Sequence, residues 1–225
     1  MMMIVIGRFD ADDDHHRSCR TGRARLVFLP MRLTKDETER NRQEILDAAE
    51  KLFRERGFDG VGVADLMKAA GFTHGGFYNH FTSKDQLAGE ATAAAFARSN
   101  AALAESLGKG SAGGWKAYIR QYLSPGHRDD PAQGCTLAAL APDAARKGPE
   151  VQARFAESIE EIVDIIAAHL GRKGNRGDRP SALRERALQM LSEMIGALVL
   201  ARAVAAADPA LSTEILAANQ RKLDG

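Results

Sequence analysis

The sequence predicts an all-α protein of about nine helices, and three observations carry this prediction. Apolar residues recur at the helical period of 3.6 through most of the chain. No alternating run of apolar and polar residues is long enough for a useful strand. Helix-start signals, namely two capping boxes and several first-turn prolines, precede the periodic segments. With 225 residues, 44% of them hydrophobic, the chain can bury an ordinary core.

A three-helix domain is expected over residues 34–82. A Thr-x-x-Glu capping box at Thr34 starts a helix that ends at Gly57 and keeps its apolar residues on one side. A short second helix is expected over 63–70 and a third over 74–81.

The rest of the chain, residues 83–225, is expected to hold six helices, separated by loops rich in glycine, proline and charge. A Ser-x-x-Gln capping box at Ser83 opens the first of them. Three of the later helices begin at prolines, which a first helical turn tolerates. Residues 124–133 are expected to form a loop. The expected helical ranges are 83–107, 112–123, 134–146, 149–170, 180–207 and 209–223.

Residues 1–33 differ from the rest of the chain. Between Arg17 and Arg32 there are five arginines and no acidic residue, and no apolar period is sustained. This composition is typical of a flexible basic arm. The alternative is a stretch upstream of a native start at Met31.

Composition and charge exclude several classes of protein. No run reaches 18 apolar residues, so we expect no membrane span. Cys19 and Cys135 cannot build a disulfide framework or a paired-cysteine zinc site, and a reducing, cytoplasmic location is the expectation. The formal net charge of +1 excludes binding to polyanions by bulk charge alone and leaves room for a local basic surface.

Residues 62–81 read as a short helix, a glycine-containing turn and a second short helix. This is the pattern of a helix-turn-helix, whose second helix can lie in the major groove of DNA. No acidic residue occurs from Leu66 to Lys84, whereas Lys68, His74 and His80 fall within that stretch. A corner of a three-helix bundle that never touches DNA is the alternative.

The segment GFDGVGVADLMKAAGFTHGGFYNHFTSKDQL carries a more specific signal. Its Gly-Phe pair, short second helix, Ala-Gly turn, Tyr-x-His-Phe ending and Ser-Lys pair resemble the signature of the TetR family of bacterial regulators. The resemblance covers about residues 41–86. It implies a DNA-binding domain over 34–82 and a ligand-binding, dimerising domain over 83–225. It also implies a homodimeric repressor that binds a pseudo-palindromic operator and is released by a small molecule.

The resemblance assigns roles within the helix-turn-helix. Thr73 corresponds to the cap of the recognition helix, His74 and Gly75 to positions near base edges, and Lys84 to a phosphate-binding lysine. For His80, packing and phosphate contact are equally supported. Independently, two residues four apart, His74 and Tyr78, share one side of a helix. The predicted DNA-binding residues are Gly62, Lys68, Thr73, His74, Gly75, Gly76, Tyr78, Asn79, His80 and Lys84.

Two glycines depart from the family pattern. Gly76 stands where threonine is usual, so two poor helix formers, Gly75 and Gly76, fall in the recognition helix. They either let the backbone approach DNA closely or leave the helix loose until it is bound. Gly62 replaces the usual serine or threonine at the cap of the second helix.

An effector pocket is expected among the later helices. Its candidate residues are apolar or aromatic, which suits a lipophilic or aromatic effector, and for each residue singly ordinary core is the more common role. Cys135 stands at an expected helix start and is either a sensor thiol or a small packing residue. The candidates are Phe96, Trp115, Tyr118, Tyr122, Cys135, Met190 and Met194.

Residues 194–207 contain one charge, Arg202, in fourteen positions. A helix that is apolar on every side needs cover on every side, which favours burial against a second subunit. Leu198 is expected in that contact, so that Leu198→Glu would give monomers or aggregates. The alternative is a helix buried inside one subunit.

An enzyme is the main rival class. Residues 108–113 fit G-x-G-x-x-G, but no strand precedes them. No P-loop, HExxH or Gly-x-Ser-x-Gly motif occurs, so we expect no catalytic residue, cofactor or metal. His15, His16 and Cys19 lie in the expected arm and are not taken as a metal site. A second rival is a helical adaptor whose helix-turn-helix no longer binds DNA.

Overall fold

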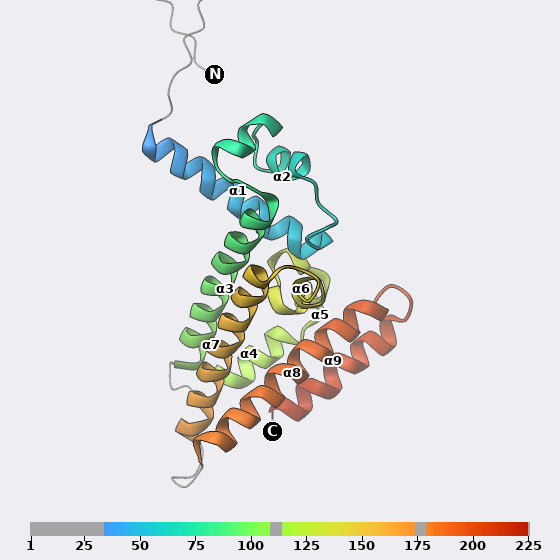
Figure 1. Cartoon of the computed structure of the whole chain (residues 1–225). Coiled ribbons are helices and arrows are strands. Elements are labelled where there is room, and N and C mark those ends of the chain that lie inside the picture. The colour runs from blue at the N-terminus through green and yellow to red at the C-terminus, as the bar shows by residue number, and fades with distance from the viewer. Residues whose placement is uncertain (1–33, 109–113, 174–178, 225) are drawn as a thin grey trace, which may run out of the picture. The chain divides into compact units, whose positions relative to one another are not determined.

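The computed structural model describes residues 34–108, 114–173 and 179–224. These residues form nine α-helices and two 3-10 helices, so the all-α prediction is confirmed (Figure 1). By internal contacts the chain divides into Met1–Leu33 and Thr34–Gly225. The predicted arm, the histidines within it and most of the 108–113 loop lie outside the described residues.

The first helices form a small three-helix unit. They are α1 (Lys35–Arg56), α2 (Val63–Ala69) and the 3-10 helix η1 (His74–Asn79). The capping box is formed: the Glu37 backbone N–H donates to Thr34 Oγ1 at 3.2 Å, and the Thr34 N–H donates to the Glu37 carboxylate at 2.8 Å. Gly57 ends α1 with a φ of 75°, a conformation that favours glycine.

The segment expected as an α-helical recognition helix is a 3-10 helix. Its hydrogen bonds span three residues, from the Gly76 N–H to the Thr73 carbonyl at 3.0 Å and from the His80 N–H to the Phe77 carbonyl at 2.9 Å. Gly75 and Gly76 explain the difference, because each weakens α-helix formation in a six-residue stretch.

The remaining helices form the larger part of the described chain. The long helices α3 and α7 lie along each other, and α8 lies against both α7 and α9 (Figure 1). The bounds are α3 Lys84–Gly108, α4 Gly114–Tyr122, α5 Pro125–Asp129, η2 Pro131–Gln133, α6 Thr136–Ala144, α7 Pro149–Lys173, α8 Pro180–Val204 and α9 Pro209–Asp224.

Residues 124–133, expected as a loop, instead contain α5 and η2. Each begins with a proline in its first turn and with a side-chain cap. Ser124 Oγ accepts the His127 N–H at 3.1 Å, and Asp130 Oδ1 accepts the Gln133 N–H at 3.2 Å. The expectation of a loop rested on the local content of glycine, proline and charge, which is also compatible with short helices that begin at such caps.

By length and composition alone, one described helix, α8, is apolar enough to cross a membrane. The buried helices of many globular proteins meet the same criterion. Here α8 packs against α6, α7 and α9 and buries Leu191, Met194 and Leu198. Packing therefore accounts for part of its apolar character, since 33% of its most apolar 18-residue window is buried.

Candidate nucleic-acid interface and ligand cavity

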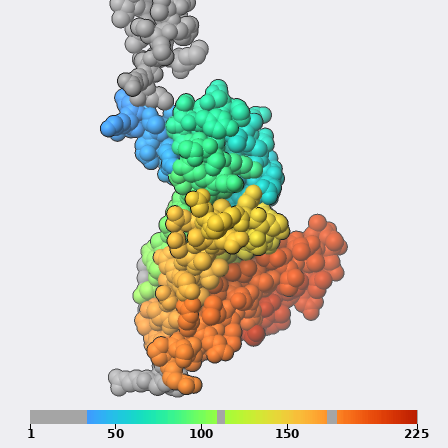
Figure 2. Space-filling model, in the orientation of Figure 1, coloured from blue at the N-terminus to red at the C-terminus, as the bar shows by residue number. Residues whose placement is uncertain are grey.

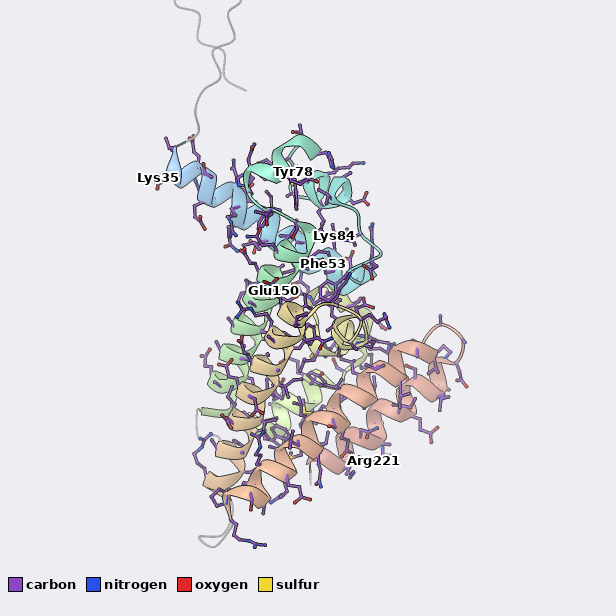
Figure 3. All side chains as sticks on the ribbon, in the orientation of Figure 1. Lys35, Phe53, Tyr78, Lys84, Glu150 and Arg221 are labelled. Atoms are coloured by element: carbon purple, nitrogen blue, oxygen red, sulfur yellow. The ribbon has the colours of Figure 1, made fainter. Side chains whose placement is uncertain are left out.

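The surface of η1 separates polar and core residues. Tyr78 is 69% exposed, and His74 and Asn79 are also exposed. Phe77, between them, is 1% exposed and packs edge-on against Tyr78 and beside Phe81. Figure 3 shows Tyr78 at the end of the described unit remote from Arg221 of α9. The buried phenylalanines thus fix which side of η1 faces outward.

The other predicted DNA-binding residues surround this surface. Exposed positions are Gly62, Lys68, Thr73 and Gly75, whereas Gly76, His80 and Lys84 are half-buried.

Gly62 caps α2 without a side chain, so only one half of a capping box is formed: the Asp65 carboxylate accepts the Gly62 N–H at 3.3 Å. Lys84 is the first residue of α3, where the helix N-terminus adds to its positive charge. The Ser83 hydroxyl accepts the Gln86 N–H at 3.0 Å, so the capping signal at Ser83 is realised.

Both roles expected for His80, packing and phosphate contact, stay predictions. Its ring lies 6.5 Å from that of Phe81, and its Nδ1 is buried with no hydrogen-bond partner among the described residues. Sequence reasoning missed Arg42, which positions this region. Its guanidinium lies 4.6 Å from the centroid of the Phe81 ring and pairs with Glu90 of α3.

A cavity of about 620 Å³ lies among α3 to α8. Tyr118, Tyr122, Cys135 and Met194, four of the seven predicted effector residues, line it. The cavity also has polar residues that sequence reasoning missed: Ser99, Asn100, Ser106, Gln121, Ser124, His127, Asp130 and Gln133. Several of these belong to the segment that had been expected to be a loop.

The structure does not bring the other three predicted residues to this cavity. Phe96 packs edge-on against Phe155 at 5.0 Å between ring centroids. The indole N–H of Trp115 donates to the Leu223 carbonyl at 2.8 Å, which fastens α4 to α9. Met190 borders a separate depression on α8 and α9.

His127 is held at both ring nitrogens. Its Nδ1 lies 2.6 Å from the Tyr122 carbonyl oxygen, and its Nε2 lies 3.0 Å from the Cys135 backbone nitrogen. A carbonyl can only accept and an N–H can only donate, so the ring is neutral and carries its proton on Nδ1. Burial lowers the pKa of His127, and the positive charge of Arg202 adds to this effect against the opposing effects of the Tyr122 carbonyl and Asp130.

This geometry predicts a loss of stability in mild acid. Because the pKa of His127 is lower in the folded than in the unfolded chain, its contribution is fully present above the unfolded value of about 6.5 and is lost as the pH falls toward the folded value. Urea unfolding between about pH 8 and pH 5 should show this decrease. His127→Gln should flatten it, whereas His74→Gln, at an exposed position, should not. An unchanged slope in His127→Gln would contradict the assignment.

Arg54 joins the wall of the cavity to α1, the helix that precedes the helix-turn-helix. Its Nε donates to the Ala132 carbonyl in η2 at 2.7 Å. Arg54 also pairs with the buried Glu50 at 3.5 Å, and Glu50 pairs with Arg98 of α3. Burial lowers the pKa of Arg54, an effect that the Glu50 carboxylate opposes.

Helix α6 makes a second connection. Its N-cap, Cys135, is half-buried at the cavity. At its other end Asp143 Oδ2 accepts the Phe58 N–H at 3.1 Å, and nearby Lys147 pairs with Asp59. One short helix therefore contacts both the cavity and the turn that follows α1.

The surface of α8 and α9 exposes large apolar side chains. Leu188, Leu200 and Leu211 are 39%, 59% and 42% exposed. Leu198, expected in a subunit contact, is 0% exposed and belongs to the core of its own subunit, so that expectation is wrong. In Figure 2 the C-terminal end of α8 and the N-terminal end of α9, drawn in orange-red, project beyond the neighbouring helices.

Comparison with known proteins agrees with these observations. Residues 45–91 match the family model described as bacterial regulatory proteins, tetR family. The chain is 42% identical over 59 residues to the HTH-type transcriptional regulator AcrR of Shigella flexneri, covering 26% of this chain and 27% of that protein. It is 28% identical over 145 residues to the HTH-type transcriptional repressor AcnR of Corynebacterium efficiens, covering 64% and 71%.

Solved structures share the fold over most of the chain. The reduced form of Escherichia coli NemR has a TM-score of 0.68 at 21% identity and covers 82% of this chain and 95% of its own. A TetR transcriptional regulator from Chloroflexus aurantiacus has a TM-score of 0.69 at 24% identity and covers 84% and 94%.

Proposed function

We propose that this chain, whose residues 45–91 match the tetR family of bacterial regulatory proteins, is a homodimeric repressor of transcription whose DNA affinity a small molecule controls. The observation that carries the proposal is the outward side of η1. There His74, Tyr78 and Asn79 are exposed above a buried Phe77, in a stretch without acidic residues.

In this proposal η1 enters the major groove and Lys84 contacts the phosphate backbone. First-turn residues of a recognition helix meet base edges, which places His74 among the reading residues. A dimer with two-fold symmetry presents two such helices to successive major grooves, so the operator has two inverted half-sites. Such a regulator acts in the cytoplasm, where its DNA is.

The cavity among α3 to α8 is the proposed effector site. Two connections support coupling between this site and DNA binding. One is the hydrogen bond from Arg54 to η2. The other is α6, whose N-cap lines the cavity and whose Asp143, at the opposite end, accepts the Phe58 N–H. A ligand that displaces η2 or the N-terminus of α6 would shift α1 and the turn after it. The population with η1 placed for DNA would then fall.

Selection of bound fragments from the source genome by the purified full chain tests the proposal. We expect enrichment of a short inverted repeat. Replacing both His74 and Tyr78 by alanine should abolish the enrichment and leave thermal unfolding unchanged, because both side chains are exposed. A normal chain that enriches no sequence would instead favour the helical adaptor.

A further inference from the structure

We infer that the cavity among α3 to α8 selects an uncharged, largely apolar ligand that bears a hydrogen-bond donor, with Asn100 and Tyr122 as the selecting residues. The inference deepens the proposed function, since it names the chemical class of its effector. The lining of the cavity carries the argument in three respects: an unpaired acceptor, an unpaired hydroxyl and the distribution of charge.

Asn100 of α3 supplies the acceptor. The side chain is 1% exposed, and its Nδ2 donates to Glu161 Oε2 at 2.7 Å and to Ser158 Oγ at 3.2 Å. A carboxylate only accepts hydrogen bonds, so the amide cannot flip without setting two acceptors against each other. Its Oδ1 is therefore fixed, and it is buried with no partner among the described residues. A ligand hydroxyl or N–H would satisfy it.

Tyr122 of α4 supplies the hydroxyl. It is 8% exposed, and the Cys135 thiol lies beside its oxygen without completing a hydrogen bond of ordinary geometry. Burial raises the pKa of Tyr122 well above its usual range, so the hydroxyl keeps its proton and can donate. A buried polar group without a partner is costly, and a ligand that pairs with it gains this free energy on binding.

The remaining lining suits an apolar body. The Tyr118 ring lies 5.9 Å from that of Tyr122, at an interplanar angle of 32°. A volume of about 620 Å³ falls within the range of small-molecule sites. The apolar side chains around it are Leu103, Leu137, Ile162, Ile166, Leu191 and Met194.

The charges disfavour an anion. No lysine or arginine of the described chain lines the cavity, and Asp130 is the single carboxylate in its lining. Arg202 lies behind this wall, where its guanidinium donates to the carbonyls of His127 at 2.9 Å and Arg128 at 3.0 Å. A carboxylate entering the cavity would lose its hydration without gaining a cationic partner.

Three probes that share one ring system test the inference on the full chain without DNA. They are 4-hydroxybiphenyl, which has a donor, 4-methoxybiphenyl, which has none, and biphenyl-4-carboxylate, which is an anion. By calorimetry we expect the hydroxyl compound to bind about tenfold more tightly than the methoxy compound, the scale of one shielded hydrogen bond. The carboxylate should bind most weakly. Equal or tighter binding of the carboxylate would overturn the inference without any variant.

Two variants then separate the roles. Asn100→Leu should abolish the preference for hydroxyl over methoxy, because only the hydroxyl can donate to Oδ1. Tyr122→Phe should weaken both compounds by a similar factor of about three to ten, because both oxygens can accept. Tyr122→Phe should unfold at an unchanged or higher temperature, since it removes a buried hydroxyl that has no partner in the free protein.

Thr92→Val is the matched control. Thr92 lies on the same helix as Asn100, and its hydroxyl is likewise buried and unpaired but does not line this cavity. Its probe affinities should match those of the unaltered chain. A hydroxyl preference that survives Asn100→Leu would refute the assignment. If the probes bind in the expected order while no genomic sequence is enriched, the ligand class stands and the repressor proposal fails.

Discussion

Replacing Leu200 by glutamate should convert the proposed dimer into soluble monomers and abolish operator binding. Leu200 is 59% exposed on α8, and Leu188 of α8 and Leu211 of α9 are exposed as well. Covering one leucine contributes about 1.5–3 kcal/mol, and two-fold symmetry places two copies of each in the contact. A glutamate there would lose this contribution and would bring an unpaired charge into a dry interface. Sedimentation equilibrium of the purified variant measures the change.

Leu198→Glu provides the contrast. Leu198 is 0% exposed. Because it precedes Leu200 by two positions, the two side chains lie about 200° apart around the helix. Its replacement should unfold the subunit, because an isolated buried carboxylate has no compensation in the core. Far-ultraviolet circular dichroism should therefore be native for Leu200→Glu and lost for Leu198→Glu. A folded Leu200→Glu dimer that still binds operator would place the subunit contact elsewhere.

The α8 helix shows where sequence reasoning reaches its limit. Its composition predicts correctly that more than one side is apolar. Periodicity cannot say which side meets α7 and α9 and which is left over, because leucines occur on both. The assignment of Leu198 to a subunit contact failed for this reason. Only the packing of the neighbouring helices shows which side of α8 is buried in the subunit and which is exposed.

Local signals predicted the local structure well. The capping box at Thr34, the glycine end of α1 and the prolines that open α7, α8 and α9 act within a few residues, so they can be read from a short stretch. The residues of η1 are likewise neighbours along the chain. Their exposure follows from the burial of Phe77 and Phe81 alone.

The cavity could be predicted only in part. Its lining comes from helices far apart in the sequence, and aromatic character alone does not distinguish a wall residue from a core residue. Tyr122 lines the cavity, whereas Trp115, with equal aromatic character, fastens α4 to α9. Asn100 gave no signal, because its importance lies in its contact with Glu161, sixty-one residues away.

Lys84 and His74 should divide the work of binding DNA. Lys84 opens α3, where its charge and the helix N-terminus both favour a phosphate. Lys84→Ala should therefore weaken binding to operator and to random DNA together. The slope of affinity against salt should fall by about one unit, the release of one counterion. Fluorescence anisotropy at several salt concentrations, with operator and scrambled duplexes, measures both quantities.

His74→Ala should have a different signature. The exposed side chain lies in the first turn of η1, the part of a recognition helix that meets base edges. Its loss should cost about 1–3 kcal/mol for the operator, the scale of one base contact, and should leave scrambled DNA and the salt slope nearly unchanged. Lys116→Ala, on α4, is a control for loss of a charge away from this surface. If His74→Ala weakens both duplexes equally, His74 contacts phosphate. Base readout would then come from Asn79 or from the backbone at Gly75, two other exposed positions of η1 among the predicted DNA-binding residues.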